Sequence, residues 1–580
     1  MKNIKDPGQR HLFDPYERLF SPLAVRTIQE GWQGLFREVI LELLPAEIIG
    51  GEFDPATGRP TKELYSMAGL ILISEFMDWT VEQASQAYMY RTDIWYSLNL
   101  KPGMHSMSTR TMERYQKIFR ENEIASVVMA DVTSRLIEIA QIDISKQRLD
   151  STHVFSNMAT FGRTRLMGVT IKRFLTQVKR HDREAYDSLP EELRDRYHKS
   201  KNRLFADTSR RSDDRRLLCQ QVAEDMNFLI ERFIEDDGNN GRSSFKDLCT
   251  VFEQQCEVID DKVGVRGSTG SDVIQNPSDP DATYDGHKGP GYQVQLSESC
   301  SEDNEVQLIT CAIPQTACEH DSKAVEKIHE DLKRSGNVPE EILADSSYGS
   351  DDNVQSCLDE EKDEDRMDLV SPASGREPDS DTRIDDFEID EETHTVMSCP
   401  AGHEPLSSEY DSDRGITRTI MSLSVCSSCE HRTKCPIKRT GSGCCVRFTD
   451  KDLRVARRRR IEKTDEFKNK YRMRSGIEAT NSGIKRRTGM GILRVRGKPS
   501  VFNAILLKTA GWNILQAARC GRVREYVREL SILGSGDDRS SIIEVCSKAF
   551  RARIRSIREY LRLLMENYGR SCTNQLWIAG

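Results

Sequence analysis

Three acidic residues stand at places in the sequence where a carboxylate could do chemistry. Asp150 lies inside the short segment KQRLDSTHVF, Asp345 ends the apolar run EEILAD, and Glu478 lies in the basic stretch YRMRSGIEATNSGIKRR. Carboxylates that converge supply the oxygen ligands that Mg²⁺ and Mn²⁺ prefer. A pair of such ions can activate a water or a 3′-hydroxyl and stabilise the leaving oxygen of a phosphodiester. The chemistry predicted for these residues is metal-dependent phosphoryl transfer.

The stretch around Glu478 is unusual because a single acid stands among bases. On a continuous helix at about 100° per residue, Tyr471, Arg474, Glu478 and Lys485 fall within an arc of roughly 60°. Arg474 and Lys485 are predicted to hold a phosphate backbone, and Tyr471 to donate to a phosphate oxygen. The predicted DNA-contacting residues are Tyr471, Arg474, Lys485, Arg486 and Arg487.

Each acid also has a plainer explanation when it is taken alone. Asp150 precedes Ser-Thr and fits a capping or turn position, Asp345 fits a loop acid at the end of a strand, and Glu478 fits a solvated helix face. The basic residues around Glu478 favour a shared site, because catalytic groups in open α/β sheets collect at strand ends and phosphate attracts bases.

The charge of the chain is segregated. A net charge of −9 argues against a simple nucleic-acid-binding protein. Residues 301–400, however, hold about 29 acidic residues against about 8 basic ones, and residues 447–499 hold about 18 basic residues against about 6 acidic ones. The basic segment includes RVARRRR, from Arg454 to Arg460, and phosphate is its predicted partner.

The elements that must position these residues can be predicted from periodicity. Residues 26–45 show an amphipathic helical pattern, residues 64–77 read as a buried helix, and Ser108 and Thr109 begin another helix. The first 140 or so residues are therefore predicted to be helical.

A sheet interrupted by insertions is predicted for the middle of the chain. Strand candidates contain Asp150, cover 292–299 and 306–313, and end at Asp345. The other predicted elements are a charged helical region at 155–255, a long loop at 264–291, a helix at 321–335, a partly disordered or solvated acidic stretch at 351–395, a buried helix at 501–520 and a tail helix at 547–565.

The motifs together resemble a known family. Tyr-x2-Arg-x3-Glu-x6-Lys, formed here by Tyr471, Arg474, Glu478 and Lys485, resembles the signature of a large group of bacterial insertion-sequence transposases. LDSTHV and ADSSYGSDDN resemble the first and second Asp motifs of the same group, and residues 30–120 resemble its amino-terminal domain. Four residues at fixed spacing, together with two Asp motifs in the family's order, identify a family far more specifically than a single motif does. The resemblance covers most of 30–515 and leaves out 521–580.

The resemblance implies a fold and a site. The fold class is α/β, with a ribonuclease-H-like catalytic core, a helical N-terminal domain, a charged helical insertion after the first strand and a Cys-rich insertion before the last catalytic helix. Asp150, Asp345 and Glu478 are the implied DDE triad, binding two Mg²⁺ (or Mn²⁺) ions. The implied division is a helical N-terminal domain over 1–140 that binds DNA ends, a first core part over 141–350 with an insertion at 155–260, an acidic and Cys-rich insertion over 351–465, a second core part over 466–520 with the Glu478 helix, and a helical tail over 521–580.

Four cysteines form a second candidate site. Cys399, Cys426, Cys429 and Cys435 are spaced as C-x26-C-x2-C-x5-C, which fits a tetrahedral thiolate site for structural Zn²⁺. Related transposases carry a similar Cys-rich segment at this place. Unligated thiols in a loop are the alternative, and the neighbouring Cys444, Cys445 and His403 could each replace a proposed ligand.

The composition of the chain indicates where in the cell the protein is located. No apolar run reaches the length of a membrane span, and the start MKNIKDPGQRHLF has no signal-peptide core. The protein is predicted to be cytoplasmic, with no membrane partner. Its sixteen Cys are therefore expected to be mostly reduced or metal-bound.

The predicted function is that of a transposase that cleaves and transfers DNA strands at insertion-sequence ends. Its predicted partners are double-stranded DNA, as terminal inverted repeats and as target, and a second copy of the chain in a homodimeric synaptic complex. The alternative is a catalytically inactive, zinc-containing DNA-binding protein derived from a transposase. A plain metal nuclease would leave the helical N-terminal region without a role.

Overall fold

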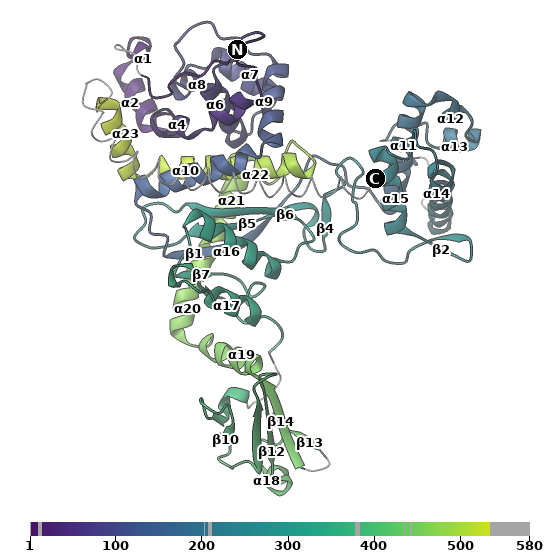
Figure 1. The fold of residues 1–580 in the computed structure, drawn as a ribbon, viewed down its shortest axis with the longest axis vertical. Helices are drawn as coiled ribbons and strands as arrows, with labels where there is room; N and C mark the ends of the chain where they lie inside the picture. Colours follow the sequence, from purple (N-terminus) through teal and green to yellow (C-terminus); the bar gives the residue numbers. More distant parts are fainter. Residues whose placement is uncertain are drawn as a thin grey trace, which may run out of the picture.

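A mixed β-sheet lies at the centre of the structure (Figure 1). The computed structural model describes residues 2–9, 14–201, 203–206, 211–377, 383–433, 435–440 and 443–533. The strand order is β6-β5-β1-β7-β8, with the short β4 also beside β5. β5 runs antiparallel to β1 and β6, whereas β7 runs parallel to β1 and β8 parallel to β7. The strands are β1 Lys146–Val154, β4 Thr283–Asp285, β5 Gly289–Ser299, β6 Ile309–Thr316, β7 Glu341–Leu343 and β8 Asp368–Val370.

This mixed α/β arrangement is consistent with the ribonuclease-H-like core that the motifs imply. The predicted strands around Asp150, at 292–299, at 306–313 and before Asp345 are all present, as β1, β5, β6 and β7. The predicted helix at 321–335 is present as a short 3₁₀ turn and α16, Ala324–Ser335.

The two faces of the sheet carry different residues of β1. Side chains alternate along a strand, so Arg148 and Asp150 share one face and Leu149 points to the other. Leu149 packs in a cluster with residues of α16, such as Ile328. Leu296, which pairs with Asp150 across the sheet, packs in the cluster that includes α22, Lys498–Ala517. Helices therefore cover both faces, and Asp150 belongs to the face of α22.

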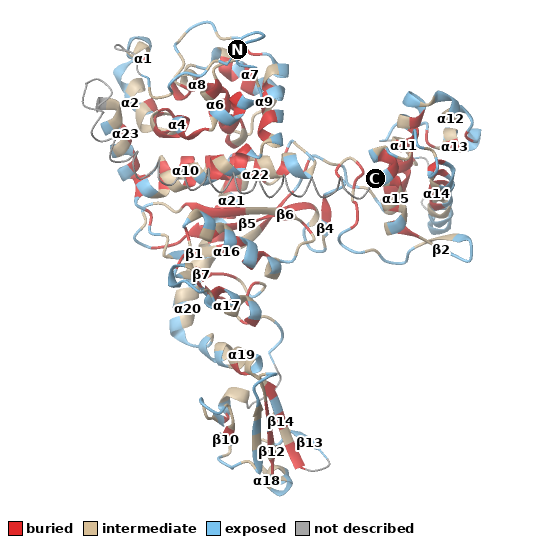
Figure 2. Ribbon diagram, in the orientation of Figure 1, coloured by how far each residue is buried: buried red, intermediate tan, exposed pale blue. Residues whose placement is uncertain are grey.

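The N-terminal helices share one hydrophobic core with the sheet (Figure 2). α6, Leu64–Phe76, is buried on nearly every side, as its continuous apolar sequence predicts. α9, Thr109–Glu121, begins where Ser108 Oγ accepts from the Thr111 amide, as predicted. α10, Ile124–Ala140, packs along α22, and the predicted buried helix at 501–520 lies within and just beyond α22.

The single helix predicted over residues 26–45 is wrong. The segment is divided into α2 Pro22–Glu30, α3 Trp32–Leu35, a π-helical turn Phe36–Ile40 and α4 Leu41–Leu43. Gly31 breaks the helix because it adopts an extended conformation, with φ −84° and ψ 178°. The apolar periodicity continued across this break, so the pattern alone did not reveal it.

The residues after β1 form a helical insertion with its own core. α11 Arg163–His181, α14 Ser212–Phe233 and α15 Ser243–Gln255 pack around buried residues such as Phe174 and Phe233. In Figure 1 these helices lie to the side of the sheet, away from the N-terminal helices. A hairpin of β2 Cys256–Ile259 and β3 Lys262–Val265 follows them.

Two parts of the acidic stretch 351–395 form regular elements that pack on the core. α17, Asp351–Leu358, and β8 lie within it, and β8 is the edge strand of the central sheet. Val354, Met367 and Leu369 are buried in the cluster beneath α16. These few apolar side chains are enough to dock the segment, although its average composition is strongly polar.

The Cys-bearing segment forms a small antiparallel sheet at one end of the structure (Figure 1). Its strand order is β11-β12-β14-β13, with α18 Leu423–Ser428 beside it. α19, Asp450–Ile461, and α20, Asp465–Tyr471, lead from this sheet back to the central one. The strands are β11 Ser407–Asp411, β12 Ile416–Met421, β13 Lys438–Thr440 and β14 Gly443–Thr449.

The last described helix is α23, Gly521–Leu533, and the tail helix predicted at 547–565 lies outside the described residues. Within the described part of the chain, none of the helices combines the length and the apolar character that a membrane crossing requires.

Candidate active site

Arg474 lies among the three predicted carboxylates. Its Nη2 is 3.0 Å from Asp150 Oδ1 and 3.7 Å from Asp345 Oδ2, and its Nη1 is 3.7 Å from Glu478 Oε1. Asp150 comes from β1, Asp345 from the turn after β7, and Glu478 from α21, Gly476–Thr488. Residues more than 300 positions apart in the sequence therefore meet around one guanidinium.

The backbone around Arg474 is not the continuous helix that was predicted. α20 ends at Tyr471, a 3₁₀ turn spans Arg472–Ser475, and α21 begins at Gly476. The prediction of one continuous helix is therefore wrong, because a tighter 3₁₀ turn separates α20 from α21. Arg474 and Glu478 still meet, because they are four residues apart.

Arg148 fixes the start of α21 against β1. Its guanidinium binds Glu298 Oε2 at 2.6 Å and also donates to the Met473 carbonyl at 3.3 Å. A Cβ at Gly476 would lie 1.8 Å from Arg148 Nη1, so glycine is what allows this close approach. Thr480 Oγ1 donates to Glu298 Oε1 at 2.7 Å. Two polar contacts thus tie α21 to the central strands.

Asp150 is held by two donors, Arg474 and Asn481 Nδ2, each at 3.0 Å. Burial raises the pKa of the Asp150 carboxyl, and the neighbouring Asp345 adds to the rise, whereas Arg474 opposes it. Asn481, on α21, is a site residue that sequence analysis missed. Its position three residues after Glu478 places it on the same side of that helix, which was the available signal.

Asp345 sits in a tight turn after β7. Its Oδ1 accepts from the Ser347 amide at 2.8 Å, and its carbonyl accepts from the Tyr348 amide at 3.2 Å. Tyr348 is buried and donates to Gln295 on β5. The Asp-x2-Tyr spacing of the motif therefore anchors the turn that carries Asp345.

Three of the predicted DNA-contacting residues, Tyr471, Arg474 and Lys485, lie near Asp150, and Arg486 and Arg487 lie farther along α21. Tyr471 is half-buried, and its ring stacks on Phe467. Burial raises the pKa of the Tyr471 hydroxyl most, Arg474 lowers it, and the nearby Asp345 and Asp150 raise it further. Burial lowers the pKa of Lys485, and the nearby cation Lys288 lowers it further, whereas the Asp150 carboxylate raises it. Arg486 and Arg487 are exposed, and Arg487 lines a cavity beside Trp32 and Trp512.

Lys288 is a second residue that sequence analysis missed. It lies on the turn between β4 and β5, with Nζ 3.5 Å from Ser151 Oγ. The predicted loop at 264–291 hid it, because nothing in the sequence shows that this turn returns to the end of β1. Lys288 and Lys485 place two cations near Asp150.

Several arginines of the block 454–460 contact acids and carbonyls of the protein, and their predicted contact with phosphate stays a prediction. Arg454 binds Asp351 at 2.6 Å, and Arg460 binds Asp385 at 2.6 Å. Arg458 donates to the carbonyls of Gly349 and Ser371. Much of the basic block is therefore held by the acidic segment and its backbone, which also explains why acids and bases are segregated in the sequence.

The carboxylate site has the donor chemistry of a divalent-metal site but not its closed geometry. Three carboxylates surround one cation, Arg474, because their negative charges favour a positive charge between them. Within the described residues, no group of three or more His, Cys, Asp or Glu side chains is close enough to hold a metal ion. Carboxylate oxygens are the type of ligand that Mg²⁺ prefers, and in this structure the distances between the carboxylates are set by the Arg474 guanidinium.

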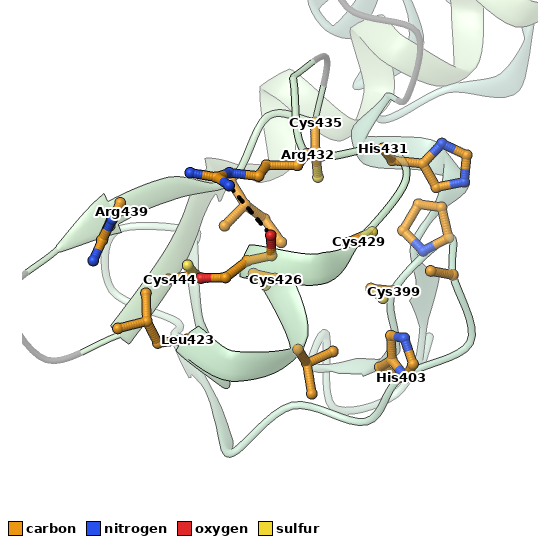
Figure 3. Close-up of a pocket in the computed structure, with 15 residues that line it drawn as sticks. Cys399, His403, Leu423, Cys426, Cys429, His431, Arg432, Cys435, Arg439 and Cys444 are labelled. Carbon is orange, nitrogen blue, oxygen red and sulfur yellow. Dashed lines mark hydrogen bonds between the residues drawn. The ribbon is translucent and has the colours of Figure 1, made fainter.

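The four predicted zinc ligands line one cavity of about 160 Å³ (Figure 3). Burial raises the pKa of Cys426 to about 12, and the neighbouring Cys444 contributes to the rise. A metal ion that binds Cys426 would have to displace the proton of its thiol. The cavity is lined by Cys399, Cys426, Cys429 and Cys435, and also by Cys444, His403 and His431.

Comparison with known protein families finds a match in the second half of the chain. A family model described as "Transposase DDE domain" matches residues 398–518, which include Arg474, Glu478 and the cysteines. No curated protein matches the sequence. Among solved structures, the chain is similar to a piggyBac transposase synaptic complex with hairpin DNA, at 10% identity and a TM-score of 0.21, over 72% of this chain and 79% of that one. A similarity this weak carries no argument here.

Proposed function

We propose that this chain, recognised as a DDE transposase by its ordered motifs and by the matched domain, cleaves DNA at the ends of an insertion sequence and joins the 3′-hydroxyls to target DNA. The observation that carries the proposal is the meeting of Asp150, Asp345 and Glu478 around Arg474. Converging carboxylates on separate elements suit transfer of a phosphodiester. The bacterial origin stays a prediction.

Asp150, Asp345 and Glu478 would hold two Mg²⁺ or Mn²⁺ ions. When bound, such ions supply an activated oxygen nucleophile and stabilise the leaving oxygen. The side chain of Asp150 is 16% exposed and that of Glu478 is 69% exposed, so the more exposed Glu478 could change its position when an ion binds.

The basic residues around the carboxylates would hold the DNA backbone. Lys485 and Lys288 lie close enough to Asp150 to act on its pKa, and each could neutralise a phosphate oxygen near the metal site. Tyr471 could donate its hydroxyl to a phosphate. Arg486 and Arg487, which are exposed, would bind DNA farther along α21.

The Cys-lined cavity would hold one structural Zn²⁺ on Cys399, Cys426, Cys429 and Cys435. All four line one cavity, and thiolate sulfurs are preferred zinc ligands. The buried Cys444 lines the same cavity and could replace one of the four. The ion would stabilise the small sheet that carries these cysteines.

The proposed partners are double-stranded DNA, as terminal inverted repeats and as target, and a second copy of the chain in a synaptic complex. The proposed location is the cytoplasm. The alternative of an inactive zinc-containing DNA-binding protein is less favoured, because the carboxylates converge although they come from three separate elements.

The test of this function separates chemistry from binding. The substrate is a duplex carrying the end of the element, which the DNA flanking the gene supplies. Asp345→Asn removes one metal-site charge, so Mg²⁺-dependent cleavage should be lost while DNA binding in Ca²⁺ survives. If Asp345→Asn cuts as well as the wild type, the proposed function fails.

Lys485→Ala is the matched variant. It removes a proposed phosphate contact and no metal ligand, so affinity should fall and the salt slope of binding should flatten by about one unit. Cleavage at saturating DNA should partly persist. An unchanged affinity and salt slope would show that this face of α21 does not touch DNA.

A further inference from the structure

A cleft of about 300 Å³ lies where the helical insertion meets the central core. α11 supplies one wall, the turn before α14 another, and two core loops the rest. The cleft has three cations and no carboxylate among its lining residues, which are Arg173, Thr176, Gln177, Lys201, Ser278 and Arg496.

Among the described residues, only one of the three cations of this cleft, Arg173, has an ion pair. Arg173 Nη1 is 3.3 Å from Asp247 Oδ2, yet that nitrogen is buried without a hydrogen-bond acceptor. No ion pair involves Lys201 or Arg496 within the described residues. Burial lowers the pKa of Lys201, and the charges of Arg173 and Arg496 lower it further. Like charges held together in this way favour an anionic ligand.

The core side of the cleft is firmly built. Asp279, fully buried, accepts from Ser156 Oγ and Tyr292 Oη at 2.6 Å and from the Gly497 amide at 3.0 Å. These bonds fix Ser278 and Arg496, which are the neighbours of Asp279 and Gly497 in the sequence. The backbone positions of Ser278 and Arg496 are therefore fixed before any ligand binds.

The loop that carries Arg496 also leads to the candidate active site. Its first part, from Gly491 to Val495, lies beside the residues that follow β1, because Phe155 pairs with Ile492 and the Asn157 amide donates to the Val495 carbonyl. The aliphatic part of Lys485 would lie 3.5 Å from a Cβ at Gly491. One loop thus connects a cation near Asp150 with a cation of the cleft.

We propose that this cleft binds backbone phosphates of duplex DNA beyond the carboxylate site, so that the helical insertion holds the same DNA on which the active site acts. The inference rests on the proposed function for the identity of the polyanion. Guanidinium, ammonium, amide and hydroxyl donors are the groups that contact phosphate oxygens. Because the proposed contact is to backbone phosphates, it adds affinity without sequence preference.

The test is a double variant, Lys201→Ala/Arg496→Ala, compared with the wild type in a salt series. The probe is a 50-base-pair duplex carrying the element's end, with Ca²⁺ in place of Mg²⁺. Loss of two phosphate contacts should flatten the slope of log affinity against log salt by about two units. Neither residue has an ion pair to lose, so the thermal midpoint should stay within a few degrees of the wild type.

The matched control is Arg216→Ala/Lys246→Ala. Both residues are exposed cations of the same insertion, and neither lines the cleft. The control should keep the wild-type slope. A slope that is unchanged in the cleft variant, or reduced equally in the control, would overturn the inference.

The outcomes also separate this inference from the proposed function. If the wild type binds the duplex and Lys485→Ala flattens the slope while the cleft variant does not, only the cleft assignment is overturned. If the wild type neither binds nor cuts the duplex, the proposed function fails and the inference falls with it.

Discussion

At the scale of single residues, Arg474 explains how three acids lie close together in this structure. Its guanidinium contacts Asp150, Asp345 and Glu478, and its side chain is only 17% exposed. Without a counter-charge, three converging carboxylates would repel one another. Arg474 therefore acts as an internal cation whose position a metal ion would share or take over.

Replacing Arg474 tests this role through the pH dependence of stability. Burial already raises the pKa of Asp150, and Arg474 opposes that rise. In Arg474→Gln the pKa should rise further. A raised folded pKa of a carboxyl means that stability is lost as the pH rises from the unfolded pKa through the folded one. The variant should match the wild type near pH 4 and be less stable at pH 8, by about 1 kcal/mol for each unit of added shift.

The measurement for Arg474 is denaturant unfolding between pH 4 and 8 in the presence of a chelator. Arg474→Lys keeps the charge and should follow the wild type closely. A difference between Arg474→Gln and the wild type that stays constant across this pH range would show that the side chain stabilises the site by packing alone.

At the scale of elements, the connection between β1 and α21 decides the geometry of the site. Arg148 is 13% exposed and Glu298 is 2% exposed, so their ion pair is largely buried. Arg148 also binds the Met473 carbonyl, one residue before Arg474. The position of Arg474 is therefore set by a residue of β1 that touches no carboxylate of the triad.

Arg148→Ala should be strongly destabilising. It leaves Glu298 buried without its cation, and breaking such a pair costs about 3–5 kcal/mol. The double variant Arg148→Met/Glu298→Leu removes both charges and should lose much less free energy of unfolding. Urea unfolding of the three proteins measures this, and equal stability of the single and double variants would contradict it.

The double variant should still be impaired in cleavage, because the contact with the Met473 carbonyl is lost and Arg474 is no longer held in register. The structure thus predicts a protein that is stable but poorly active. Full cleavage by the double variant would show that this contact does not position the site.

The sequence allowed the elements to be predicted where local pattern decides, and failed where distant contacts decide. The continuous apolar run of α6 and the capped start at Ser108 were sufficient to predict helices. The 3₁₀ turn at Arg472–Ser475 and the docking of β8 depend on partners far away in the chain. For the site, ordered motifs indicated three acids. The helical spacing from Glu478 could have indicated Asn481, whereas only the fold places Lys288 there.

At the scale of the whole molecule, the N-terminal helices, the sheet and α22 share one hydrophobic cluster. The buried Lys508 strengthens this connection, since its Nζ donates to the carbonyls of Glu75 and Thr488 at 2.8 and 2.6 Å. DNA bound by the N-terminal region would therefore be held in a fixed relation to α21. The helical insertion and the Cys-bearing sheet, by contrast, have clusters of their own.

Zinc removal should affect only the Cys-bearing sheet. Metal analysis should find about one zinc per chain, and Cys399→Ser or Cys429→Ser should abolish it. Hydrogen exchange should then rise over 396–449 and stay unchanged around Asp150. Cys318→Ser, outside the cavity, is the control and should keep the zinc. Purified protein without zinc would contradict the site.

Counting bound Mn²⁺ by electron paramagnetic resonance tests most directly whether Asp150, Asp345 and Glu478 together hold the proposed metal ions. The sample is the protein in complex with a duplex carrying the element's end. The wild type should bind about two Mn²⁺ ions that are about 4 Å apart and therefore magnetically coupled. Asp150→Asn, Asp345→Asn and Glu478→Gln should each lose the coupled signal while the DNA stays bound. A coupled pair that persists in all three variants, or no bound Mn²⁺ in the wild type, would contradict the account.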